Sequence, residues 1–392
     1  MKVLHVYSGN LFGGIETMLL ALAEAEGSTD ARTRTHEFAA CFDERLASEL
    51  RAAGARVHLL GAVRLSRPAS AHRARRALSA VLHAGAFDRV ICHAPWAQAI
   101  FGSVVRRHRV PLAFWAHDRM NGRHWTERLA RHVRPQLVIA NSTFTARTQA
   151  ALYPGLPSAV VYPPARAVAP TRSRRHVRMS LGTPQDHVVI VQASRCEAWK
   201  GHHLLLEALA HVRTIPGWTW WIVGGAQRPD EAAYVAELRD AAHRYGIADR
   251  IAWLGQRPDV ATLLAAADVY CQANVQPEPF GLAFVEALAA GLPVVSVRHG
   301  GVMEIVDDSC ARLVPPGDVD ALASTRIRIG VTTSLTMKKD GTGAPPPTVS
   351  VWDAVVTWPA SSVALSTTII GVAGLPDGAV GAGVPGATAA PE

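Results

Sequence analysis

Short apolar runs rich in β-branched residues alternate with helical patterns from the start of the chain to about residue 324. One series of runs comprises residues 3–7, 56–60, 89–94, 112–117 and 137–142, and a second comprises 188–194, 220–225, 250–255, 269–273 and 293–297. Amphipathic segments such as 15–26 and 203–212 stand between them. This alternation predicts an α/β fold with parallel sheets that are covered by helices on both faces.

The two series predict two domains. A chain of 392 residues exceeds the size at which single cores usually stop growing. The stretch 160–175 is rich in proline and arginine and lacks periodicity, which is typical of a linker. We expect Rossmann-like domains at 1–165 and 187–324, joined by a linker at 166–186. A ligand cleft should lie between the carboxyl edges of their sheets.

Residues 325–392 have a different composition. Gly, Pro, Thr, Ser and Val dominate, and only eight of these 68 residues are charged. The uncharged run 354–376 is long enough to raise the alternative of a membrane span. Its prolines and its hydroxyl-bearing residues favour a loose tail with a few strands instead.

Composition narrows the class of ligand. Hydrophobic residues make up 49% of the chain and charged residues 18%, enough for a soluble core. The net charge of +8 suits nucleotide phosphates or an anionic lipid surface, while no nucleic-acid-binding motif is found. The five cysteines are scattered, which predicts buried thiols rather than disulfides or a metal site. The chain starts directly with a predicted strand and shows no secretory signal, so we expect a cytoplasmic protein.

Two glutamates occur in the apolar stretch PEPFGLAFVEALAAGLPVV, which covers residues 277–295. Glu278 precedes a predicted helix, and Glu286 lies one to two turns inside it. Unpaired amides at the start of that helix suit an anion, and the residues concerned are Phe280, Gly281 and Leu282. Carboxylates on both sides would accept hydrogen bonds from vicinal hydroxyls, which together with the anion site fits a sugar nucleotide. The alternative is a capped helix with two solvated glutamates.

Several segments in the expected order resemble glycosyltransferase family 4, whose members are retaining enzymes of the GT-B architecture. The segments are residues 13–16, 140–146, 193–212, 254–281 and 277–306. The likeness covers about 1–324 and implies two Rossmann-like domains facing a central cleft. Relatives normally continue with further amphipathic helices, whereas this chain changes composition.

The resemblance implies roles for the charged residues of the second domain. Arg195 and Lys200 would neutralise the diphosphate of the donor, although each alone could be a solvated surface charge. Glu278 would contact the transferred sugar at the reaction centre, and Glu286 would bind the ribose hydroxyls. Backbone amides of Phe280, Gly281 and Leu282 would hold phosphate or sugar.

In the first domain, Gly13 and Gly14 belong to a strand–helix loop that would approach the donor phosphate; a simple tight turn is the alternative. Their spacing is not that of the dinucleotide fingerprint. His117 ends a strand and matches the family histidine that contacts the transferred sugar. Glu304 follows a double glycine at another matching position, and no role is assigned to it.

Two further features are weighed against simpler interpretations. Asp318 and Asp320 have the Asp-x-Asp spacing of metal-dependent transferases, but their context predicts a helix N-cap, and we expect no metal site. Residues 64–85 carry five arginines and a stripe of Leu78, Val81 and Leu82. An amphipathic surface helix explains them; docking to an anionic membrane, peripheral to the inner face of the plasma membrane, is the alternative.

The resemblance implies a retaining, metal-independent glycosyltransferase without a cofactor. Its co-substrate would be a UDP- or GDP-sugar, and its acceptor a hydroxyl of a glycan, lipid-linked or small-molecule compound. A catalytically impaired sugar-nucleotide-binding relative is the alternative, because the C-terminal helices of the family are missing. A nicotinamide-dependent oxidoreductase is disfavoured by the missing fingerprint.

Overall fold

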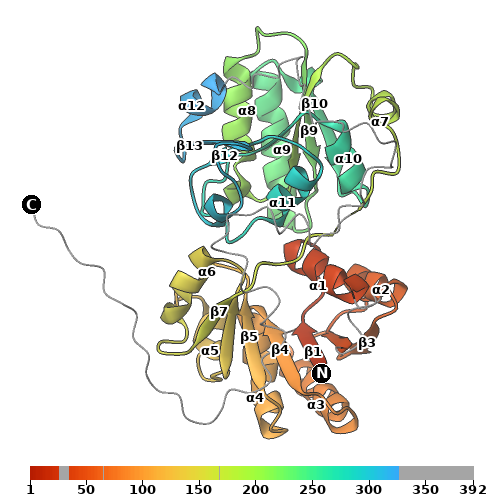
Figure 1. The fold of residues 1–392 in the computed structure, drawn as a ribbon, viewed down its shortest axis with the longest axis vertical. Helices are drawn as coiled ribbons and strands as arrows, with labels where there is room; N and C mark the ends of the chain where they lie inside the picture. Colours follow the sequence, from red (N-terminus) through yellow and green to blue (C-terminus); the bar gives the residue numbers. More distant parts are fainter. Residues whose placement is uncertain (26–34, 65, 167, 326–392) are drawn as a thin grey trace, which may run out of the picture.

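The computed structural model describes residues 1–25, 35–64, 66–166 and 168–325. They form two α/β domains, the first below the second in Figure 1. Predictions about residues 326–392, including the span at 354–376, lie outside the described residues. Within the described ranges, no helix combines the length and the apolar character needed to cross a membrane.

The first domain is built on a seven-stranded, all-parallel sheet of order β3-β2-β1-β4-β5-β6-β7. The strands are β1 Lys2–Tyr7, β2 Thr35–Ala40, β3 Arg56–Leu59, β4 Arg89–His93, β5 Leu112–Ala116, β6 Leu137–Ala140 and β7 Ser158–Val160. Helices α1 (Gly14–Ala25) and α2 (Arg45–Ala52) cover one face, and α3 (Pro68–Ala84) and α4 (Ala94–Arg107) cover the other. The short helices α5 (Trp125–Ala130) and α6 (Thr143–Thr148) follow β5 and β6.

The second domain repeats the plan with a six-stranded parallel sheet of order β10-β9-β8-β11-β12-β13. The strands are β8 Val188–Ala193, β9 Trp218–Val223, β10 Ile251–Gly255, β11 Val269–Gln272, β12 Val294–Val297 and β13 Ala311–Val314. Helices α8 (His202–His211), α9 (Pro229–Arg244) and α12 (Val319–Ser324) cover one face. Helices α7 (Arg174–Ser180), α10 (Val260–Ala266) and α11 (Leu282–Ala289) cover the other.

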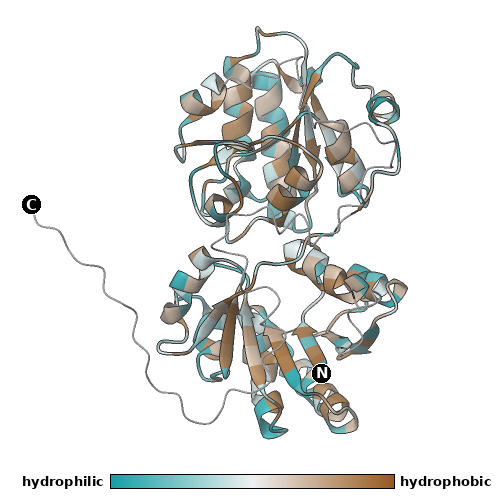
Figure 2. Cartoon of the chain, in the orientation of Figure 1, coloured by the Kyte–Doolittle hydropathy of each residue, from teal (hydrophilic) through white to brown (hydrophobic). Residues whose placement is uncertain are grey.

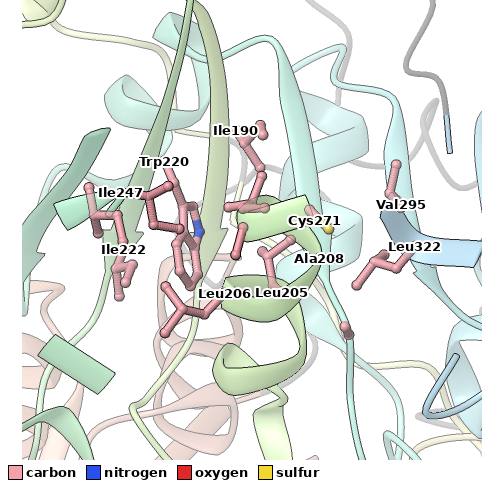
Figure 3. Close-up of a cluster of buried hydrophobic side chains, with 14 of the residues drawn as sticks. Ile190, Leu205, Leu206, Ala208, Trp220, Ile222, Ile247, Cys271, Val295 and Leu322 are labelled. Atoms are coloured by element: carbon pink, nitrogen blue, oxygen red, sulfur yellow. The ribbon is translucent and has the colours of Figure 1, made fainter. Parts of the chain in front are cut away.

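Side chains on alternate sides of β9 fill the core on both faces of the second sheet. Trp218 and Trp220 point to the face of α8 and α9, while Trp221 points to the opposite face. Figure 3 shows Trp220 next to Leu206 of α8. Because neighbouring side chains of a strand leave opposite faces of the sheet, a fully buried strand has to be apolar on both sides. Figure 2 shows the brown strands inside and teal residues on the outer helices.

The predicted α/β plan is confirmed, and the structure differs from the sequence analysis in two places. Strands β2, β7 and β13 were not predicted from the apolar runs. The predicted linker at 166–186 also contains a helix, α7, that packs on the second domain. Its Arg178 is fully buried and pairs with Asp268 at 2.5 Å.

Candidate functional site at the domain interface

A partly buried ion pair joins the segments that follow two strands of the second domain. Lys200 follows β8 and places Nζ 2.8 Å from Oε2 of Glu278, which follows β11. The same oxygen accepts hydrogen bonds from Asn274 at 2.7 Å and Gln272 at 3.0 Å. These three donors offset the cost of burying a carboxylate that is 6% exposed. Oε1 of Glu278 accepts no hydrogen bond from the described residues and is available to a ligand.

Glycines allow the loops around this pair to pack backbone against backbone. Gly201 has a φ of +70°, and a Cβ atom there would lie 1.6 Å from the carbonyl oxygen of Ala273. Gly300 has a φ of +84°, and its Cβ would lie 2.4 Å from the carbonyl oxygen of Glu278. The next amide, of Gly301, donates to that oxygen at 2.7 Å. Only glycine fits both approaches.

Arg195 lies where the second domain faces the loop before α1. Its guanidinium pairs with Glu197 and lies 3.7 Å from Oε1 of Glu231. Its positive charge also acts on two first-domain residues, Tyr7 and Glu16. Burial raises the pKa of both, and the charge of Arg195 opposes these increases. Arg195 is therefore held among carboxylates rather than extended into solvent.

The start of α11 forms part of the domain interface. Gly281 is the N-cap with a φ of +106°, and a Cβ there would lie 2.4 Å from the ring of Phe284. Phe280 is buried and stacks on Tyr162, with 5.6 Å between ring centroids. Tyr162 follows β7 in the crossover, the segment in which the chain passes from the first domain to the second. The predicted helix at 282–290 is thus present, whereas the side chain of Phe280 serves packing.

Glu286 lies in the second turn of α11 and is half-buried. Burial raises its pKa to about 7, and the positive charge of Arg166 opposes the increase. Arg166 is itself bound by Glu24 of α1 through two hydrogen bonds of 2.6 and 2.9 Å. The second predicted glutamate is therefore near the crossover between the domains and is not a freely solvated carboxylate.

The glycine loop of the first domain contacts the second domain directly. The amide of Gly13 donates to Oε2 of Glu16 at 2.8 Å, and Gly14 starts α1. A Cβ on Gly14 would lie 3.7 Å from Leu282. The backbone of Phe12 exchanges two hydrogen bonds, of 2.8 and 2.9 Å, with the side chain of Gln227.

His117 follows β5 at the same interface. Its Nε2 lies 2.8 Å from Nδ1 of His93, and burial lowers the pKa of His117 to about 3, so the ring is neutral. Charged residues of the second domain affect the pKa of the neighbouring Asp118. Burial raises the pKa of Asp118, the charge of Glu278 raises it further, and Lys200 lowers it. The loop after β5 therefore faces the Lys200–Glu278 pair.

Glu304 makes interdomain contacts that the sequence did not assign. Its two carboxylate oxygens accept hydrogen bonds from the amides of Thr143 and Phe144, at 2.8 and 2.7 Å, at the start of α6. The hydroxyl of Tyr162 donates to it at 3.0 Å. Beside it, the Ser142 hydroxyl donates to the carbonyl oxygen of Pro279 at 2.5 Å. Figure 1 shows α1 and α6 of the lower domain at the junction with the upper one.

The remaining predicted residues lie outside the interface. Asp318 caps α12 by accepting from the amide of Ala321 at 2.8 Å, and Asp320 lies 3.3 Å from His211. No group of three potential ligands suited to a metal occurs in the part of the chain that the structure describes. All five cysteines are free, and four of them are buried.

The arginine-rich segment forms α3, whose Leu78 and Leu82 are buried against the first sheet. Four of the five arginines are exposed: Arg64, Arg67, Arg73 and Arg76. The structure thus shows a surface helix. Membrane contact stays a prediction, which sedimentation with anionic vesicles would test.

Sequence reasoning missed several polar residues around the predicted site. Gln272 is the last residue of β11, Asn274 follows that strand, and Asp118 follows β5, so a search for polar side chains at strand ends would have found them. Glu231 lies in the first turn of α9, and nothing in the local sequence marks it as a partner of Arg195.

Comparison with known proteins gives a family match for the second domain. Residues 173–329 match the family described as glycosyl transferases group 1. The lipopolysaccharide core biosynthesis glycosyltransferase LpsE of Rhizobium meliloti is 32% identical over 147 residues, 37% of this chain and 40% of that protein. The phosphatidyl-myo-inositol mannosyltransferase of Mycobacterium leprae is 36% identical over 136 residues, 34% of each chain. The matches cover less than half the length of these relatives.

Solved structures match both domains. Alr3699/HepE of Anabaena in complex with UDP and glucose superposes with a TM-score of 0.70 at 27% identity, covering 82% of this chain and 88% of that one. A glycosyltransferase from Rickettsia africae has a TM-score of 0.69 at 18% identity, with coverage of 82% and 86%, and shows the fold alone. The fold is therefore GT-B, and the second domain carries the likeness to glycosyl transferases group 1.

Proposed function

We propose that this protein is a glycosyltransferase that moves a sugar from a nucleotide-diphosphate donor to an acceptor hydroxyl. The observation that carries the proposal is the Lys200–Glu278 pair, which faces the first domain with one carboxylate oxygen free of described partners. The match of residues 173–329 and the likeness to a protein solved with UDP and glucose support it.

The donor diphosphate would lie between Arg195 and Lys200, with amides at the start of α11 as further donors. A forked guanidinium and a compact ammonium together neutralise the charge that develops on the leaving phosphate. Oε1 of Glu278 would accept from a hydroxyl of the sugar, and Glu286 would bind the ribose. His117 would contact the same sugar from the first domain.

We further propose that the protein is a retaining enzyme of glycosyltransferase family 4. The leaving phosphate would take the proton of the incoming hydroxyl on the face from which it departs. The protein would orient the partners and stabilise charge, and the two cationic side chains would supply what a metal ion supplies elsewhere. The matched relatives are named for lipopolysaccharide core biosynthesis and for phosphatidyl-myo-inositol, so we propose a glycan or lipid-linked acceptor.

The test is turnover of UDP- and GDP-sugars by the purified full chain with a panel of acceptors. We expect release of nucleoside diphosphate and a product with the anomeric configuration of the donor. Glu278→Ala should reduce turnover by about 100-fold or more, because a charge contact at the reacting centre is lost. Glu237→Ala, on the exposed face of α9, is the control. Turnover that survives Glu278→Ala, or inversion of configuration, would contradict the proposal.

A further inference from the structure

Four buried or half-buried histidines form a continuous hydrogen-bonded row in the first domain. Nε2 of His117 lies 2.8 Å from Nδ1 of His93, and Nε2 of His93 lies 2.9 Å from Nδ1 of His5. Nε2 of His5 then lies 2.8 Å from Nδ1 of His36. The row starts at the domain interface and ends inside the first domain.

Strand register produces the row. The four residues come from neighbouring strands β2, β1 and β4 and from the end of β5. The residues paired across these strands are Val3 with His36, Ile91 with His5, and Trp115 with His93. Each step to the next strand therefore advances two residues toward the carboxyl edge. A shift of two keeps every ring on the same face, the one covered by α1 and α2.

The rings are packed tightly, and burial keeps three of them neutral. Successive ring centroids along the row are 5.1 Å apart, and Trp115 stacks on both His93 and His117 at 5.5 Å. Burial lowers the pKa of His5 and His93 well below the usual value, and that of His117 to about 3. The residue after His93, Ala94, has a φ of +67°, in the left-handed region that a residue other than glycine seldom adopts.

Neutral imidazoles constrain one another along such a row. When all four rings are neutral, each has one N–H and one lone pair, and only two arrangements satisfy the three contacts between the rings. In the first, each Nε2–H donates toward His36, and Nδ1 of His117 is an acceptor. In the second, each Nδ1–H donates toward His117, whose own Nδ1 is a donor. A mixed arrangement would set two hydrogens or two lone pairs against each other, at about 1–3 kcal/mol.

We propose that this row is a tautomer relay in which Nδ1 of His36 sets whether Nδ1 of His117 accepts from or donates to a hydroxyl of the bound sugar. Nδ1 of His117 has no hydrogen-bond partner among the described residues. The two arrangements hold the same number of protons: the first carries one on Nε2 of each ring, and the second carries one on Nδ1 of each ring. His5, His36 and His93 are thus positioning residues. The role toward the sugar rests on the proposed function, whereas the hydrogen-bond order does not.

The test is long-range ¹H–¹⁵N NMR of the full chain labelled at histidine, which identifies the protonated nitrogen of each neutral ring. We expect His5, His93 and His117 to carry their protons on the same nitrogen. His5→Phe interrupts the row, so the His117 signals should move toward a mixture of tautomers. Since His5 is buried, His36→Leu at the end of the row is a second variant with the same expected effect. His108→Asn, which removes a ring bonded to Ser79 away from the row, is the control.

Activity supplies a second readout. Both row variants should lower kcat for sugar transfer about tenfold and leave nucleoside diphosphate affinity unchanged, because the proposed diphosphate site at Arg195 and Lys200 belongs to the second domain. Different protonated nitrogens in the wild-type row, or unchanged His117 signals in both folded variants, would overturn the relay. The predicted NMR pattern in a chain that turns over no donor would retain the relay and reject the proposed reaction.

Discussion

Glu278 shows how a buried carboxylate can be fixed through one of its oxygens while the other stays without a partner among the described residues. Lys200, Gln272 and Asn274 all approach Oε2, and this leaves the other oxygen open to a ligand. Donors that are already in place need not reorganise when a substrate binds, which is the main electrostatic advantage of a folded site. The sequence predicted Glu278 and Lys200 individually. It could not predict that they pair, because 78 positions separate them.

Glu286 should make the stability of the folded chain depend on pH. Its pKa is raised from 4.5 to about 7 in the folded chain, so the folded state binds more protons than the unfolded state between these values. The contribution of this group to stability is therefore complete below about pH 4.5 and falls as the pH rises to about 7, by at most about 1.4 kcal/mol per unit.

Urea unfolding at about pH 5 and about pH 8 would measure this difference. Relative to Glu286→Gln, which cannot titrate, the wild type should lose stability between the two conditions. A constant difference between the two proteins would show that the carboxyl group is not perturbed.

At the scale of elements, the turn before α8 depends on one glycine. Gly201 combines a φ of +70° with a Cβ position 1.6 Å from the backbone of Ala273, whereas Gly217 has a φ of +75° and open space around it. Gly217→Ala should cost about 1–2 kcal/mol for the left-handed conformation alone. Gly201→Ala should cost more, because the backbone must also move. Thermal unfolding of both variants checks the order, and equal losses would contradict it.

Element type was predictable wherever hydrophobic periodicity was strong. The apolar strands β8 to β12 and the helix after Gly281 were expected and are present. Strand β2 begins with the polar Thr35 and His36, and β7 has only three residues. Such strands give a weak pattern in isolation, and pairing with a neighbouring strand supplies the order that the local sequence does not show.

At the scale of the whole molecule, Glu304 binds the start of α6 and joins the two domains. Two backbone amides at the start of α6 and the hydroxyl of Tyr162, in the crossover between the domains, all donate to this one carboxylate. Glu304→Ala should weaken the interface, because charge-assisted hydrogen bonds are among the stronger polar contacts. Energy transfer between dyes on the two domains should report a longer mean distance. Glu237→Ala should leave the distance unchanged, and an unchanged distance in Glu304→Ala would exclude this role.

The site as a whole was only partly predictable from the sequence. Motif order placed Arg195, Lys200, Glu278 and His117 near one another, and the structure brings them to the domain interface. Glu231 and the row of histidines behind His117 depend on tertiary packing and strand register, neither of which is contained in local spacing.

The central claim is that cations of the second domain hold the donor diphosphate, and calorimetric titration with UDP and GDP tests it most directly. The wild type should bind at least one of them, and Lys200→Met and Arg195→Met should each weaken that affinity about tenfold or more. Arg244→Met, at the exposed end of α9, is the control and should bind as the wild type does. Unchanged affinity in both site variants, or no binding of either nucleotide to the wild type, would contradict the account.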